Sequence, residues 1–195
     1  MALLEPDVIL TLQRQVPKLT RKKLEQAAKK KFKEIKQEMI NEFLANPITQ
    51  EIMGGSGGTN ISGTLGGVSN LFAFIGFNEG DDPIAPILTL LEGVTLEYQS
   101  EIKRSTLGFG VNFRVTLPLA EDIFAITPLP WATGRSWAAG IERGLSGLGH
   151  LLKKNKGRSG AAIQTSVKVR GGKFQNAPYI SALILKYKKK FEELK

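Results

Sequence analysis

The stretch that decides the fold is residues 18–45, KLTRKKLEQAAKKKFKEIKQEMINEFLA. Its apolar side chains recur at steps of three or four residues, at Leu24, Ala28, Phe32, Ile35, Met39 and Phe43. This spacing places them on one face of a helix, and lysines occupy most of the remaining surface. Pro17 and Thr20 are typical of a helix start, and Pro47 of a stop. We therefore predict a long, basic, amphipathic helix over residues 18–45.

The composition of the chain predicts one domain, residues 1–195, without covalent cross-links. With 195 residues and 42% hydrophobic content, the chain is long enough to bury one sizeable core for that helix to pack against. The absence of cysteine excludes disulfides, a thiolate nucleophile and cysteine-ligated metal sites. We expect no membrane contact and no secretion, because the chain has neither a long apolar run nor a positively charged leader before an apolar stretch.

The net charge of +9 is concentrated in two terminal segments. Residues 18–36 hold nine Lys or Arg against two Glu, and residues 186–195 hold five Lys against two Glu. The rest of the chain is therefore close to neutral. Two interpretations stay open, a solvated helix face and an electrostatic contact with nucleic-acid phosphates. The candidate electrostatic contacts are Arg21, Lys22, Lys29, Lys30, Lys188 and Lys189.

A glycine-rich segment follows the long helix. Residues 54–67, GGSGGTNISGTLGG, contain seven glycines, so we predict a loop or arm over residues 53–70 rather than a helix or strand. The segment lacks both glycine motifs that bind nucleotide phosphates: GxGxxG is absent, and no Lys-Ser or Lys-Thr follows the glycines. We expect this segment to be mobile in a free subunit and ordered by a neighbour. The aromatic run that follows, LFAFIGF at residues 71–77, should be buried in the core or against another subunit.

The remaining residues, 71–195, predict an α+β body. Alternating apolar residues predict a hairpin of strands 94–103 and 111–117, and a third strand at 161–170, which together form a small antiparallel sheet. Helices are predicted at three places: residues 83–91 ended by Gly93, a glycine-rich helix over 137–152 packed on the sheet, and a C-terminal helix after Pro178.

The chain lacks the residue patterns of the common catalytic and metal sites. His150 is the only histidine, and Ser146 lacks the second glycine of a nucleophile elbow. The adjacent carboxylates at 81–82 and 121–122 are typical of turns rather than of acid-base pairs. We therefore predict a protein that is not an enzyme and has no cofactor, metal or small-molecule substrate, although an enzyme of another kind stays a third possibility.

Two segments and the order of the elements resemble a known family. The segment NISGTL at 60–65 is similar to a short motif that follows the first helix in these proteins, and NAPYISALILKYKKKF at 176–191 is similar to their closing helix. The family is the neck and tail-completion proteins of long-tailed bacteriophages. The resemblance implies a non-enzymatic virion structural protein that forms a homo-oligomeric ring at the head–tail junction as a connector or tail-completion subunit.

That resemblance also implies the partners and the contact surface. The partners are other neck, portal-side or tail proteins, with at most weak nonspecific contact to DNA. A basic, sequence-independent nucleic-acid-binding protein is the alternative function. The candidate subunit interface comprises Leu65, Leu71, Phe72, Phe74, Ile75, Phe77, Trp137, Gly140 and Gly144.

Overall fold

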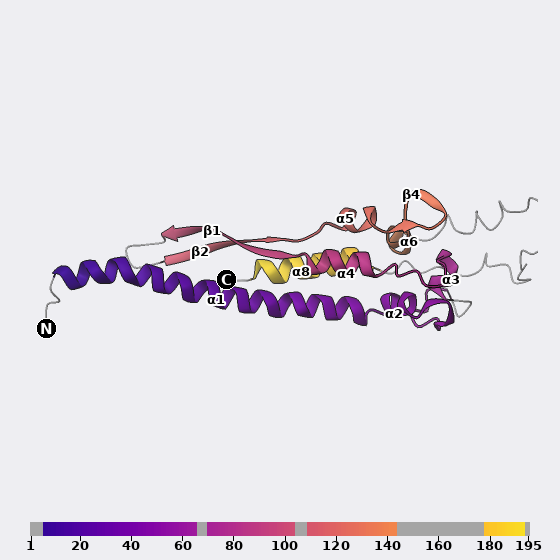
Figure 1. Ribbon diagram of the computed structural model, residues 1–195, viewed down its shortest axis with the longest axis horizontal. Helices are drawn as coiled ribbons and strands as arrows, with labels where there is room; N and C mark the ends of the chain where they lie inside the picture. Colours follow the sequence, from indigo (N-terminus) through magenta and orange to yellow (C-terminus); the bar gives the residue numbers. More distant parts are fainter. Residues whose placement is uncertain (1–5, 66–69, 104–108, 144–177, 194–195) are drawn as a thin grey trace, which may run out of the picture.

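Helix α1 (Pro6–Ala45) runs along most of the length of the molecule, and the other elements pack along one side of it (Figure 1). The computed structural model describes residues 6–65, 70–103, 109–143 and 178–193. At 1.5 Å per residue the 40 residues of α1 span about 60 Å. The helix begins at Pro6, well before the predicted residue 18, and continues through Pro17, although an interior proline removes one backbone hydrogen bond and crowds the preceding turn. Pro17 and Thr20 were therefore wrong as start signals.

The apolar stripe of α1 is buried progressively from its amino-terminal to its carboxyl-terminal half. Met39 and Phe43 are fully buried, Phe32 and Ile35 are half-buried, and Leu24 is 38% exposed. The stripe is thus confirmed as a core face near its end. Towards its start the helix extends past the core, with strands β1 and β2 beside it (Figure 1).

Helix α8 (Ile180–Glu192) lies antiparallel against α1, which confirms the predicted C-terminal helix. Lys186 is 2.6 Å from a carboxylate oxygen of Glu42, and Lys190 pairs with Glu38 one turn away. The phenol of Tyr187 donates a hydrogen bond to Glu42. These contacts join helices that are more than 140 residues apart in sequence.

The Glu42 cluster predicts a pH dependence of stability. Hydrogen bonds from Lys186 and then from Tyr187 hold the pKa of Glu42 below its ordinary value of 4.5. The unfolded chain therefore binds this proton first, so the contribution of Glu42 is present above pH 4.5 and is lost as the pH falls through the lower pKa of the folded state. We expect Glu42→Gln to flatten the fall in unfolding free energy below pH 4.5, measured by urea titration at several pH values. An unchanged slope would contradict this role.

Short helices enclose the core around Trp137. They are α2 (Pro47–Met53), α3 (Leu71–Ile75), α4 (Ala85–Glu92), α5 (Ala120–Ala125) and α6 (Trp137–Arg143), with a 3-10 turn at Gly55–Gly57. The predicted helix at 83–91 is confirmed as α4, with Gly93 at its carboxyl-terminal cap. Helix α6 confirms the first turns of the predicted helix 137–152, and the rest of that helix lies outside the described residues.

The strands form two small antiparallel sheets, not one. Strands β1 (Thr95–Lys103) and β2 (Phe109–Thr116) form the predicted hairpin, in which Tyr98 is opposite Phe113. A second pair, β3 (Pro128–Leu129) and β4 (Ala132–Ser136), leads directly into α6 and was not predicted. The predicted strand at 161–170 lies outside the described residues. The architecture is α+β, as predicted.

Candidate functional surfaces

The predicted subunit interface is largely part of the subunit's own core. Leu71, Phe72, Ile75 and Trp137 are buried there, which contradicts their assignment as residues free to meet a neighbour. The reason is that LFAFI forms the short helix α3, capped by Asn70 and Gly76, and this helix turns its apolar side chains inward. Leu65, Phe74 and Phe77 are half-buried against the same core, Gly140 is half-buried in α6, and Gly144 lies outside the described residues.

Glu51, which the sequence analysis did not single out, holds the glycine-rich segment in place. It is fully buried at the end of α2. Its carboxylate accepts hydrogen bonds from the backbone N–H of Ser62 at 2.9 Å, from the Ser62 hydroxyl, and from the backbone N–H of Leu71 at 2.7 Å. One carboxylate thus ties two distant points of the chain to α2. The sequence did contain a signal for this role. Glu51 lies beside a glycine-rich stretch, whose backbone N–H groups need acceptors, and a carboxylate can accept them.

Asn70 completes the same clamp from the other side. Its side-chain amide donates to the carbonyls of Ser56 and Gly58, at 3.0 and 2.8 Å, and its carbonyl oxygen caps α3 through Ala73 N–H. A Cβ atom at Gly58 would lie 3.2 Å from the Glu51 carbonyl oxygen, a tight contact that glycine avoids. The described residues 54–65 are therefore folded against their own subunit and do not extend away as an arm.

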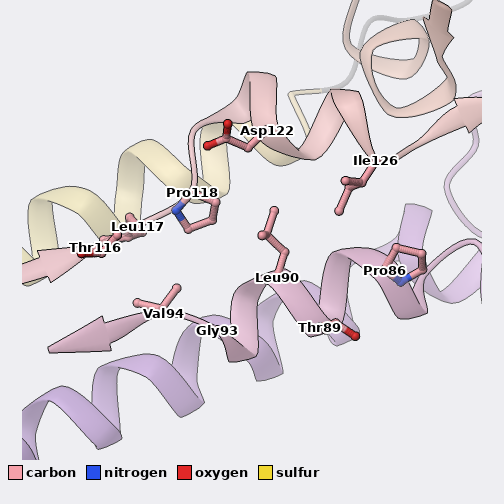
Figure 2. A pocket seen from close by; sticks show the side chains of 10 residues that line it. All are labelled: Pro86, Thr89, Leu90, Gly93, Val94, Thr116, Leu117, Pro118, Asp122 and Ile126. Atoms are coloured by element: carbon pink, nitrogen blue, oxygen red, sulfur yellow. The ribbon is translucent and has the colours of Figure 1, made fainter.

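An open apolar groove lies between α4, the strand ends and α5 (Figure 2). Its volume is about 590 Å³, and its lining comprises Pro86, Thr89, Leu90, Gly93, Val94, Thr116, Leu117, Pro118, Asp122 and Ile126. Leu119, one residue beyond Pro118, is 62% exposed. The Asp122 carboxylate accepts the Leu119 N–H at 2.8 Å and so caps α5. The groove thus presents chiefly apolar side chains, which suit a protein surface better than a charged small molecule.

The basic side chains divide into engaged and exposed groups. Arg21 lies 4.2 Å from the Tyr98 ring centroid and donates to Glu25, so it supports the packing of the hairpin on α1. Lys36 donates to the carbonyls of Glu92 and Val94 at the end of α4. The exposed group comprises Lys22, Lys23, Lys29, Lys30, Lys31 and Lys33 on α1, Lys188 and Lys189 on α8, and Arg114 and Arg135 on strands β2 and β4.

The carboxylate pairs of the sequence act as turn and cap residues. Asp81 accepts the backbone N–H of Asn78 at 2.7 Å, and Asp82 accepts the N–H groups of Ile84 and Ala85 at the start of α4. This confirms the interpretation of the first pair as turn residues. Within the described ranges, no group of three or more acidic or histidine side chains is close enough to hold a metal ion, and no helix is sufficiently long and apolar to cross a membrane.

Helix α2 connects the two segments that carry the family resemblance. Glu51 holds Ser62 in the first segment, as described above. In the second segment, the buried Tyr179 is hydrogen-bonded to Thr49 at 2.7 Å, and burial raises the pKa of this phenol. Thr49 and Glu51 are both fully buried polar residues of α2. Comparisons of the chain with protein-family models, with curated proteins and with solved structures find no match.

Proposed function

We propose that the protein is a non-enzymatic virion structural protein of long-tailed bacteriophages. It assembles as a ring at the neck, where it acts as a connector or tail-completion subunit between portal-side and tail proteins. The observation that carries the proposal is the open apolar groove beside α4 and α5; Leu119, which follows the lining residue Pro118, is exposed. The resemblance of residues 60–65 and 176–191 to neck proteins supports the same assignment.

The groove supports a contact with a second copy of the chain. A patch of Leu90, Leu117 and Ile126 that stays exposed to water costs free energy, at roughly 25 cal/mol per Å² of apolar area, which a covering neighbour recovers. The described surface offers further exposed apolar side chains away from the groove, at Met53 and Ile61. A groove on one subunit that meets a different surface on the next makes a head-to-tail contact, and such contacts close into rings when the rotation permits.

The test is assembly of Leu119→Asp against a matched control. The buried carboxylate opposes covering of the groove, so we expect the variant to lose the ring, in solution or on its partners, in light scattering and electron microscopy. Leu185→Asp makes the same chemical change at a site on α8 that is 57% exposed, and it should assemble as the wild type does. Equal melting temperatures would show that both variants fold.

Two results would overturn the proposal. Rings formed equally well by Leu119→Asp, and also by a second variant in the groove lining, Ile126→Asp, would exclude the groove as the contact. A wild-type chain that is monomeric alone and present as a single copy in its native particle would exclude the ring.

A further inference from the structure

One face of α1 carries five exposed lysines. Lys22, Lys29 and Lys33 follow one another at steps of seven and four residues, so they lie on one side of the helix. Lys23 and Lys30, seven residues apart, lie on the adjoining side. At 1.5 Å per residue, these positions extend over about 16 Å of the helix axis. We call this set the lysine face.

The tertiary contacts distinguish the lysine face from the basic residues that are paired within the subunit. Lys186 and Lys190 pair with Glu42 and Glu38, and Lys36 caps α4. In the described part of the chain, no carboxylate pairs with the five lysines of the face, and Glu25 is engaged by Arg21. The positive charge of the lysine face is therefore not neutralised by these neighbours.

The composition of the lysine face favours a polyanion over a protein partner. Protein interfaces are depleted in lysine and depend on aromatic and apolar anchors. Between Lys22 and Lys33, the residue that shares this side of the helix is Gln26, which is exposed and polar. Single-stranded nucleic acids are held by stacking of bases on aromatic rings, and this face has none. A row of ammonium groups matches the regularly spaced phosphates of a duplex.

We propose that the lysine face binds the phosphate backbone of duplex DNA without sequence preference. This goes beyond the proposed function, which requires only protein contacts, and it does not depend on ring formation. Each neutralised phosphate releases a counterion, so contact by all five lysines gives a slope of about −4.5 in log affinity against log salt. The affinity should then fall several-hundred-fold between roughly 50 and 200 mM salt.

The experiment measures fluorescence anisotropy of two labelled duplexes of unrelated sequence at several salt concentrations. The variant is Lys29→Gln/Lys30→Gln, and the matched control is Lys188→Gln/Lys189→Gln, which removes the same charge from an exposed pair on α8. We expect the first variant to make the slope shallower by about two and to weaken both duplexes equally. The control should keep the wild-type slope. Circular dichroism checks that both variants are folded.

Three outcomes would overturn the proposal. Equal losses in the two double variants would mean that net charge, rather than the lysine face, is responsible. Tight binding of one duplex only would mean that base edges are read. Competition by polyglutamate as effective as by unlabelled duplex would assign the face to an acidic protein instead.

Discussion

Replacing Trp137 with alanine is expected to lower the free energy of unfolding by about 3–5 kcal/mol. Trp137 is 1% exposed, and its ring packs edge-on against Phe77 and beside Tyr179, at centroid distances of 5.9 and 6.5 Å. Removal of the indole leaves a cavity between Phe77, which follows α3, and Tyr179, which precedes α8. Urea unfolding followed by circular dichroism measures the loss.

The control for this prediction is Leu185→Ala, which truncates an exposed side chain on α8. It should change the unfolding free energy by no more than about 0.5 kcal/mol. The comparison also tests whether Trp137 is a core residue rather than a subunit contact. If this residue served a subunit contact, its replacement would leave the stability of the isolated chain unchanged and would alter assembly instead.

Replacing Glu51 with alanine is expected to cost about 3 kcal/mol or more. The substitution removes the acceptor for three donors, the N–H groups of Ser62 and Leu71 and the hydroxyl of Ser62. Each buried donor left without a partner costs about 1–3 kcal/mol. Because Glu51 tethers the glycine-rich segment to α2, limited proteolysis mapped by mass spectrometry should show new cleavage within residues 54–65.

The exposed Glu79, in the turn before α4, offers a control for this effect of carboxylate removal. Glu79→Ala should match the wild type in both stability and cleavage pattern. If Glu51→Ala unfolds at the wild-type urea concentration and resists protease equally, the carboxylate does not hold the segment.

The sequence by itself determined the elements whose signals are local. The three- and four-residue spacing from Phe32 to Phe43 predicts a helical core face, and alternation predicts the hairpin of β1 and β2. Gly93 is at the carboxyl-terminal cap of α4, as predicted, although its backbone is right-handed, with φ −73°, and does not form the left-handed cap typical of glycine. These patterns are readable because a helix or hairpin must have one apolar side wherever its partner comes from.

The start of α1 and the second sheet were not readable in this way. Proline is typical of a helix start and, inside a helix, lacks a donor and crowds the preceding turn, so the local sequence favours a start near Pro17 rather than the continuous helix found. In β3, two prolines flank Leu129 and oppose a strand. The pair with β4 forms nonetheless, because Thr127 and Trp137 are joined by a backbone hydrogen bond of 2.9 Å.

Only the tertiary structure decided which side chains are available to a partner. Periodicity shows that LFAFI is apolar but cannot say whether its own core or a neighbour covers it, and α3 turns it inward. The lysine clusters near both termini look alike in sequence. Glu38 and Glu42 of α1 engage Lys190 and Lys186 of α8, whereas in the described residues no carboxylate pairs with the lysine face. Charge counting cannot detect this difference, because pairing depends on which helices meet.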